Sequence, residues 1–282
     1  MEIGIFARTF FRPTLEETLD AVVGHDLRCI QFNFALCGGE SMPATIEPRL
    51  TRRVRRATTE RDISIAAVSG TFNMIHPDAS RRTDGLRRLH VLASACADIG
   101  TVIITLCTGT RDPGDMWSAH PDNQSDEAWR DLLTSMAQAV AIAEETGVNL
   151  AFEPEVSSVV DTVEKGRRLL DAIRSPHLKV VMDPANLFHR GQIGAMPDVL
   201  DRAFDLLGHD IVIAHAKDLS QDGEAGHEAA GEGLLDYDRY LRLLCGVRFD
   251  GPLILHSLTE TQVDGCVAFL REKLVVQAER AR

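Results

Sequence analysis

Four ionisable side chains in the second half of the chain each follow an apolar run, at the point where a buried strand would end. They are Glu153 in AFEPE, Asp183 in VVMDPAN, His215 in IAHAKD and His256 in LILHS. Brought together away from water, such groups lose hydration and repel one another unless a cation lies between them. Oxygen and imidazole ligands without thiolate suit Mn²⁺, Co²⁺, Fe²⁺, Mg²⁺ or Zn²⁺, so the four residues predict one divalent metal site.

Each of these residues, taken alone, also fits a structural role. Asp183 precedes a proline and fits the cap of a turn. His215 fits a hydrogen-bonded histidine of the core. The recurrence of the pattern after four successive apolar runs favours a shared metal over four unrelated roles, because of the electrostatic cost of gathering these groups without one.

The elements that would position these residues alternate along the whole chain, with short apolar runs followed by longer amphipathic segments. The expected strands span Ile3–Ala7, Cys29–Asn33, Ile63–Ser69, Val102–Leu106, Asn149–Glu153, Lys179–Asp183, Ile211–Lys217 and Leu253–His256. The expected helices span Thr14–Gly24, Pro48–Arg61, Ser80–Ile99, Asp126–Gly147, Val159–Arg174, Met196–Leu207, Asp236–Cys245 and Glu260–Glu279. Gly100 and Gly147 are expected as helix C-caps, and Asp126 and Asp236 as N-caps.

Eight such units predict the α/β class and a single parallel (β/α)₈ TIM barrel over residues 1–282, in which the C-terminal strand ends form the active-site face. An open doubly wound sheet is the alternative. No G-x-G-x-x-G or G-x-x-x-x-G-K-[ST] loop follows any expected strand, which removes the usual nucleotide-site support for that alternative.

Composition narrows the function classes. The formal charge is −12, which disfavours nucleic acid and acidic membranes as partners. The arginines between Arg49 and Arg56 are spread around a helix surface and are interpreted as a solvated face. Six cysteines without a CxxC pair are expected to be reduced and buried, and the absence of a leader or long apolar run predicts a cytoplasmic protein.

Five further residues on the same expected rim are candidates for binding substrate: His76, Arg111, Trp117, His189 and Lys217. The two histidines fit an exposed loop equally well, and the tryptophan also fits a subunit contact. The lysine fits an ion pair with the following aspartate or a neighbouring strand-end acid at least as well as a substrate contact. The glycine-rich segment after the seventh expected strand is interpreted as a cover over the site.

The ordered motifs FEPE, MDPANL, HAKD, GEGLLDY and GPLIL resemble those of the xylose isomerase-like barrel superfamily over nearly the whole chain. Relatives that isomerise or epimerise ketoses bind one divalent metal through four residues, the last of which is a glutamate after the eighth strand. The resemblance implies that Glu153, Asp183 and His215 are the first three of these ligands here. His256 stands at that last position here, which puts the usual pair of acid/base carboxylates in doubt. The implied activity is a sugar, sugar phosphate or sugar acid isomerase or epimerase that works through a metal-stabilised enediolate. Glu153 is then ligand and base, and His256 or Glu155 returns the proton.

Other functions remain open beside this one. A metal-dependent dehydratase or lyase acting on a sugar acid or cyclitol shares the first step, and a catalytically lapsed sugar-binding barrel fits the histidine at position 256. Endonuclease action is disfavoured by the acidic charge and by too few ligands for a multi-metal cluster. The expected partners are a small sugar-derived substrate and further copies of the chain in a homo-oligomer.

Overall fold

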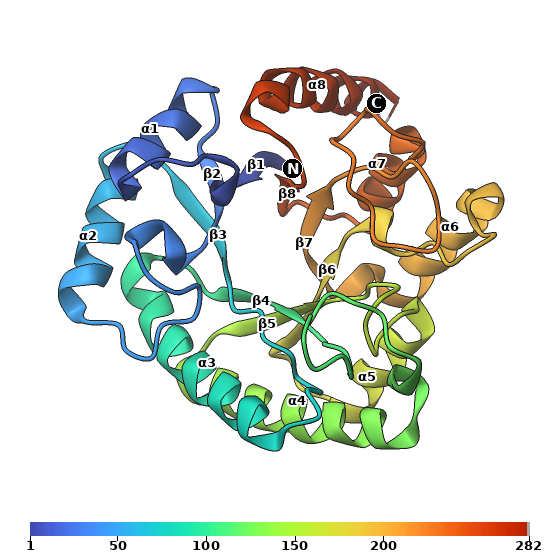
Figure 1. Cartoon of the computed structure of the whole chain (residues 1–282). Coiled ribbons are helices and arrows are strands. Elements are labelled where there is room, and N and C mark those ends of the chain that lie inside the picture. The colour runs from blue at the N-terminus through green and yellow to red at the C-terminus, as the bar shows by residue number, and fades with distance from the viewer. Residues whose placement is uncertain (281–282) are drawn as a thin grey trace.

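Eight parallel strands close into a barrel in the computed structural model, which describes residues 1–280 (Figure 1). Each strand pairs with the next along the chain, and β8 pairs with β1 to close the ring. The strands are β1 Glu2–Phe6, β2 Cys29–Phe32, β3 Ser64–Ser69, β4 Ile103–Cys107, β5 Asn149–Glu153, β6 Leu178–Met182, β7 Ile211–Ala216 and β8 Pro252–Leu255. The predicted TIM barrel is confirmed.

Eight helices surround the strands and alternate with them. They are α1 Leu15–Gly24, α2 Pro48–Thr59, α3 Ala79–Ile99, α4 Asp126–Thr146, α5 Val163–Ile173, α6 Met196–Leu207, α7 Tyr237–Gly246 and α8 Val263–Arg280. Most lie within one or two residues of the predicted ranges, and α8 begins three residues late because a 3-10 turn, Glu260–Gln262, precedes it. Among the described helices, none is long and apolar enough to cross a membrane.

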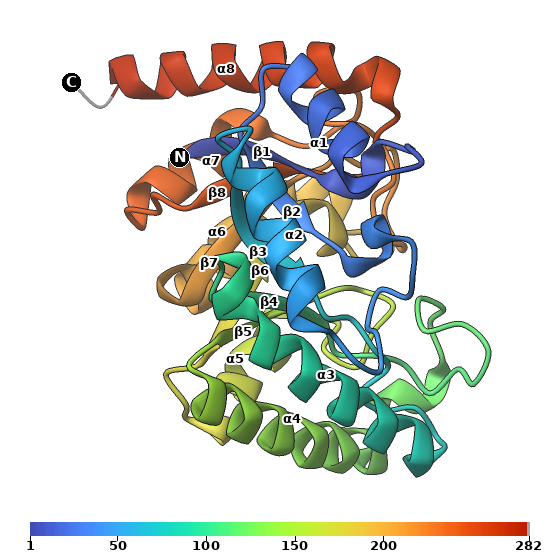
Figure 2. The same cartoon turned by 90° about the vertical axis from the view of Figure 1, so that its left-hand side faces the viewer.

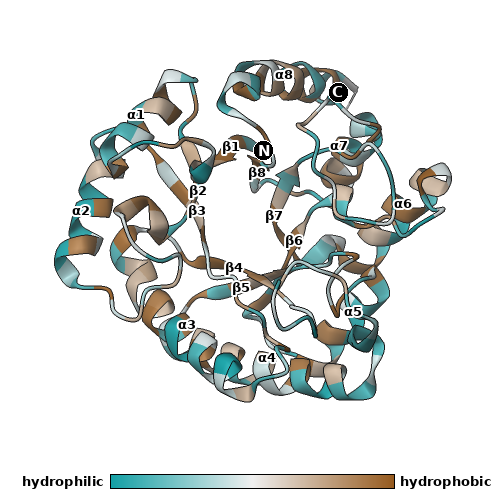
Figure 3. Ribbon diagram, viewed as in Figure 1, coloured by the Kyte–Doolittle hydropathy of each residue, from teal (hydrophilic) through white to brown (hydrophobic). Residues whose placement is uncertain are grey.

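The two faces of the strands have different neighbours. Small and branched side chains fill the interior of the barrel, and the strand faces turned outward pack against the helices in a larger cluster. The interior set comprises Cys29, Ala67, Ala151, Val181, Ile213 and Ile254. Figure 3 shows this arrangement as apolar strands ringed by helices with mixed apolar and polar faces. The continuous apolar runs of the sequence follow from burial on both faces.

Helix α5 shows the largest departure from the predicted boundaries, since it starts at Val163 and not at Val159. The Thr162 side chain accepts a hydrogen bond from the Lys165 backbone N–H and caps the helix there. The preceding residues turn back onto the rim, where the Val159 N–H donates to the Gly109 carbonyl. The segment after β5 is therefore part of the active-site face.

Three of the four helix caps predicted from the sequence are present in the structure. Gly100 and Gly147 are left-handed C-caps with φ of 90° and 73°, and Asp236 is the N-cap of α7, as predicted. The prediction for Asp126 is wrong, because Ser125 caps α4 and accepts from the Ala128 N–H. All six cysteines are free thiols, but Cys245 is exposed and Cys37 only half-buried, so the expectation that all would be buried is wrong for these two residues.

The long βα loops lie on one side of the barrel, and the start of β1 and the end of α8 lie on the other (Figure 2). Helix α7 anchors the strand ends on the loop side. The hydroxyl of the fully buried Tyr240 shares its one proton between the backbone carbonyls of Met182 and His215, at 3.2 and 3.0 Å. One side chain of the outer layer thus ties together the ends of β6 and β7, where two of the predicted metal ligands stand.

Candidate active site

Three of the four predicted metal ligands meet at the C-terminal end of the barrel. Nδ1 of His215 lies 3.4 Å from Oε2 of Glu153 and 3.4 Å from Oδ2 of Asp183, and one ligand atom from each residue lies within 4.8 Å of the others. The side chains of Asp183 and His215 are 0% and 3% exposed, whereas that of Glu153 is 20% exposed. Glu153 is therefore the member of the group that a molecule in the cavity can reach.

The hydrogen bonds around His215 leave one of its ring nitrogens available to bind a cation. The Gln31 amide N–H₂ donates to the hydroxyls of Ser69 and Thr105, which turns its Oε1 toward Nε2 of His215 at 3.1 Å. The proton on the imidazole therefore sits on Nε2, and the lone pair of Nδ1 faces two carboxylates. Nδ1 of His215 and Oδ2 of Asp183 are buried and make no hydrogen bond, although the latter has the ammonium of Lys217 beside it. Such a donor set suits a divalent metal.

The ammonium group of Lys217 lies beside these ligands and partly neutralises the negative charge of Asp183. Its Nζ lies 3.2 Å from Oδ2 of Asp183 and donates to Oδ1 of Asn186 at 2.7 Å. Burial opposes ionisation of Asp183, but the positive charge of Lys217 outweighs it, and the pKa of Asp183 stays well below its ordinary range. The ion pair that the sequence suggested between Lys217 and a strand-end acid is therefore present, and Lys217 also lines the central cavity.

A cavity of about 680 Å³ opens above the ligands at the barrel mouth. Glu153, Glu155, Lys217 and His256 line it, and Trp117 stands at its edge with 51% exposure. Burial, with the nearby charge of Glu153, raises the pKa of Glu155 to about 7. Burial also raises the pKa of Glu153. The cavity thus contains one carboxyl group, that of Glu155, that can hold a proton near neutral pH.

His256 is placed differently from the other three predicted ligands. Its ring stacks between His215 and Phe6, with centroid distances of 5.3 and 5.2 Å, and its Nδ1 bonds the Ser257 hydroxyl at 2.8 Å. It therefore lies outside the compact group of ligand atoms. Burial, with the positive charge of Lys217, lowers the pKa of His256 to about 3, so the ring is neutral at physiological pH.

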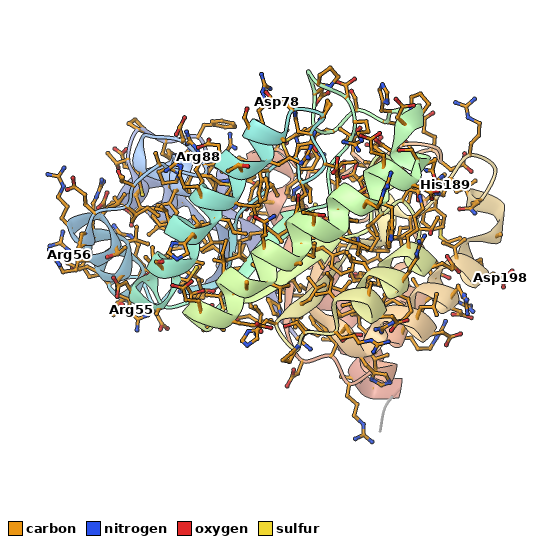
Figure 4. All side chains as sticks on the ribbon, turned by 90° about the horizontal axis from the view of Figure 1, so that it is seen from below. Arg55, Arg56, Asp78, Arg88, His189 and Asp198 are labelled. Atoms are coloured by element: carbon orange, nitrogen blue, oxygen red, sulfur yellow. The ribbon has the colours of Figure 1, made fainter. Side chains whose placement is uncertain are left out.

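Three of the predicted substrate contacts do not line the central cavity. His76 faces a separate hollow beside the N-terminus of α3, and its Nδ1 accepts from the Asp78 N–H. Arg111 is buried in an ion pair with Asp131, at 2.8 Å. His189 bonds the Asp161 carbonyl at the outer flank of the barrel, where Figure 4 labels it. Loop residues are directed by contacts between distant segments, which spacing along the chain does not reveal.

The segment after β7 lies against the cavity, as predicted for a cover. Gly223, Glu224, Ala225 and His227 contribute to the lining. The buried Asp218 carboxylate ties the segment down by accepting from the backbone N–H groups of Leu219, Gly231 and Leu235. The aspartate of HAKD therefore shapes this loop, while the lysine of the same motif faces the site.

Three residues at the site were not singled out from the sequence. Gln31 orients His215, Asn186 donates to Oε1 of Glu153 while accepting from Lys217, and Arg8 lines the mouth. A signal existed for Gln31, a polar residue inside the apolar run CIQF, and for Asn186 within MDPAN. Nothing local marked Arg8, which follows β1 like many surface arginines.

The arginines of α2 form the solvated face that was expected. Arg49 pairs with Glu47 and Arg53 with Glu16. Figure 4 shows Arg55 and Arg56 at an outer edge of the molecule, far from the labelled His189. These positive charges are spread over the helix surface and do not form a site with the barrel mouth.

A family model described as xylose isomerase-like TIM barrel matches residues 19–273. The chain belongs to this family. The match covers most of the barrel, including all the strands that carry the three clustered ligands. The resemblance seen in the motifs is therefore confirmed.

Individual relatives are more distant. L-ribulose-5-phosphate 3-epimerase UlaE of Shigella flexneri is 23% identical over 211 residues, which are 75% of this chain and 69% of that protein. The crystal structure of a D-tagatose 3-epimerase-like protein covers all of both chains with a TM-score of 0.80 at 14% identity. The IOLI protein, solved with a bound zinc atom, covers 99% of both chains with a TM-score of 0.73 at 16% identity. At these identities the solved structures show the shared fold.

Proposed function

We propose that the protein is a divalent-metal-dependent sugar epimerase or isomerase, with Glu153, Asp183 and His215 as the residues that hold the metal. The observation that carries this proposal is the group of three ligand atoms within 4.8 Å of one another, two of which, on Asp183 and His215, are buried and make no hydrogen bond. Support comes from the epimerase relative and from the zinc atom in a protein of the same fold. A metal bound there would act as a Lewis acid that polarises a sugar carbonyl.

The chain's own residues supply the proton transfers of an epimerisation. Glu153 is reachable from the cavity, and its raised pKa makes it a stronger base than an ordinary carboxylate once ionised. It removes the proton from the carbon next to the carbonyl. Asn186, which donates to Oε1 of Glu153, holds the carboxylate in place.

Glu155 is the better of the two candidates for returning the proton. Its pKa, raised to about 7, lets Glu155 hold a proton near neutral pH, whereas the ring of His256 is neutral there and carries no second proton to donate. Nδ1 of His256 is also engaged with Ser257. We therefore assign proton return to Glu155, and to His256 the role of packing against the imidazole of His215.

The test is the variant Glu153→Gln, loaded with Mn²⁺ and incubated with ketoses in D₂O. Loss of both epimerisation and deuterium exchange at the carbon next to the carbonyl, with an unchanged circular dichroism spectrum, is expected. Glu145→Gln, on the exposed face of α4, is the matched control and should behave like the wild type. Retained exchange in the Glu153 variant excludes it as the base. Release of a 2-keto acid from sugar acids would instead establish the dehydratase alternative.

A further inference from the structure

A second, smaller cavity adjoins the central one at the rim between the first and last strands. It has a volume of about 490 Å³ and shares four residues with the central cavity: Phe6, Arg8, His256 and Ser257. The pairing of β1 with β8 places the loops that follow these strands side by side. A molecule bound above the metal ligands can therefore extend past His256 into this side cavity.

The cations around the two cavities differ in their partners. Arg12 makes a two-pronged ion pair with Glu260, at 3.0 and 2.5 Å, and Lys217 is held by Asp183 and Asn186. Arg8 is exposed and has neither an ion pair nor a hydrogen bond to its side chain among the described residues. Its full positive charge faces both cavities.

The loop after β8 adds free hydrogen-bond donors to the same place. Ser257 has a left-handed backbone with φ of 53°, which is unusual for a residue other than glycine and is often found at functional sites. The backbone N–H groups of Ser257 and Leu258 have no acceptor among the described residues, and both residues line the side cavity. Backbone N–H groups in such turns are frequent partners of anions.

We propose that the side cavity binds an anionic group at the far end of the substrate, a phosphate ester or a carboxylate, with Arg8 as its main ligand. The inference rests on the proposed function and narrows the substrate class to sugars that carry such a group. A guanidinium matches the oxygens of phosphate and carboxylate with two parallel hydrogen bonds. Loops after the last strands of TIM barrels commonly bind phosphate, which agrees with this location.

The test compares a 2-ketopentose, its 5-phosphate and a ketose that ends in a carboxylate, each with Mn²⁺-loaded protein. We expect kcat/KM to favour one of the anionic sugars over the neutral one by at least about tenfold. Arg8→Ala should reduce that preference by at least about tenfold, mainly through KM, and Arg8→Lys should restore part of it. Arg49→Ala, which removes an exposed charge from α2, controls for net charge. The anionic sugar that is preferred identifies the group.

Binding of inorganic phosphate, measured by calorimetry, separates failure of this inference from failure of the proposed function. Phosphate that binds the wild type and binds Arg8→Ala at least fivefold more weakly supports the site, even if no sugar is turned over and the epimerase proposal fails. Equal losses of kcat/KM for neutral and anionic sugars in Arg8→Ala, or equal phosphate affinities of the two proteins, would overturn the assignment while leaving the epimerase proposal intact.

Discussion

Oε1 of Gln31 accepts a hydrogen bond from Nε2 of His215 at 3.1 Å, across the barrel from β2 to β7. The bond selects which imidazole nitrogen carries the proton, because the Gln31 amide hydrogens are already given to Ser69 and Thr105. The other nitrogen is left with its lone pair toward Glu153 and Asp183. Gln31, which would not itself contact the proposed metal, thus leaves Nδ1 of His215 free to bind it.

Replacing Gln31 by Leu should weaken divalent metal binding by about 10- to 100-fold, the usual effect of removing a partner that orients a histidine ligand. The fold should persist because the side chain is replaced by one of similar volume. Calorimetric titration with Mn²⁺ measures the change. Gln31→Glu, which keeps an acceptor facing Nε2, is expected to bind more tightly than Gln31→Leu. Wild-type affinity in Gln31→Leu would show that the tautomer of His215 does not depend on this bond.

Metal removal should destabilise the protein. A ligand that binds only the folded state stabilises it by about 2.7 kcal/mol at one hundred times its Kd. We expect the Tm to rise on adding Mn²⁺ to EDTA-treated protein and the rise to disappear in Asp183→Asn, which loses a buried ligand. Arg49→Ala, on the outer surface, should keep it. Equal Tm values with EDTA and with Mn²⁺ would contradict the assignment of the site.

Metal-free protein should lose stability as pH rises from 4.5 to about 7, on account of Glu155. Its pKa is about 7 in the folded state against the ordinary 4.5 of an unfolded glutamate, so the folded state binds more protons in this window and the stability that Glu155 contributes falls with rising pH. Glu155→Gln should therefore raise the free energy of unfolding at pH 8 by up to about 3 kcal/mol, at 1.36 kcal/mol for each pH unit, and change it little at pH 4.5. Urea unfolding with EDTA at both pH values measures this difference. The idea is wrong if the variant gains no more stability at pH 8 than at pH 4.5.

Tyr240→Phe should cost about 1–3 kcal/mol of stability, because two buried carbonyls, those of Met182 and His215, lose their shared donor. Since these carbonyls belong to the strand ends that carry metal ligands, Mn²⁺ affinity should fall as well. Urea unfolding and metal titration of the same variant give both numbers. Unchanged stability would mean that water replaces the hydroxyl at no cost.

The sequence by itself determined the barrel and the three clustered ligands. Both follow from local patterns: apolar runs mark buried strands, and a polar residue directly after a run must emerge at the C-terminal face, where all eight strand ends meet. Glu153, Asp183 and His215 could be named for this reason before their distances were known. The helix caps at Gly100 and Gly147 were equally local.

Only the tertiary structure decided which rim residues face the cavity. His76, Arg111 and His189 were as plausible from spacing as Trp117, yet their directions depend on partners such as Asp131, which lies on another element. The same holds for the bond between Gln31 and His215, which joins residues 184 positions apart. The strand pattern in the sequence determines which residues lie on the rim of the barrel. The contacts between distant segments in the folded chain determine where each side chain points and whether its charge is neutralised.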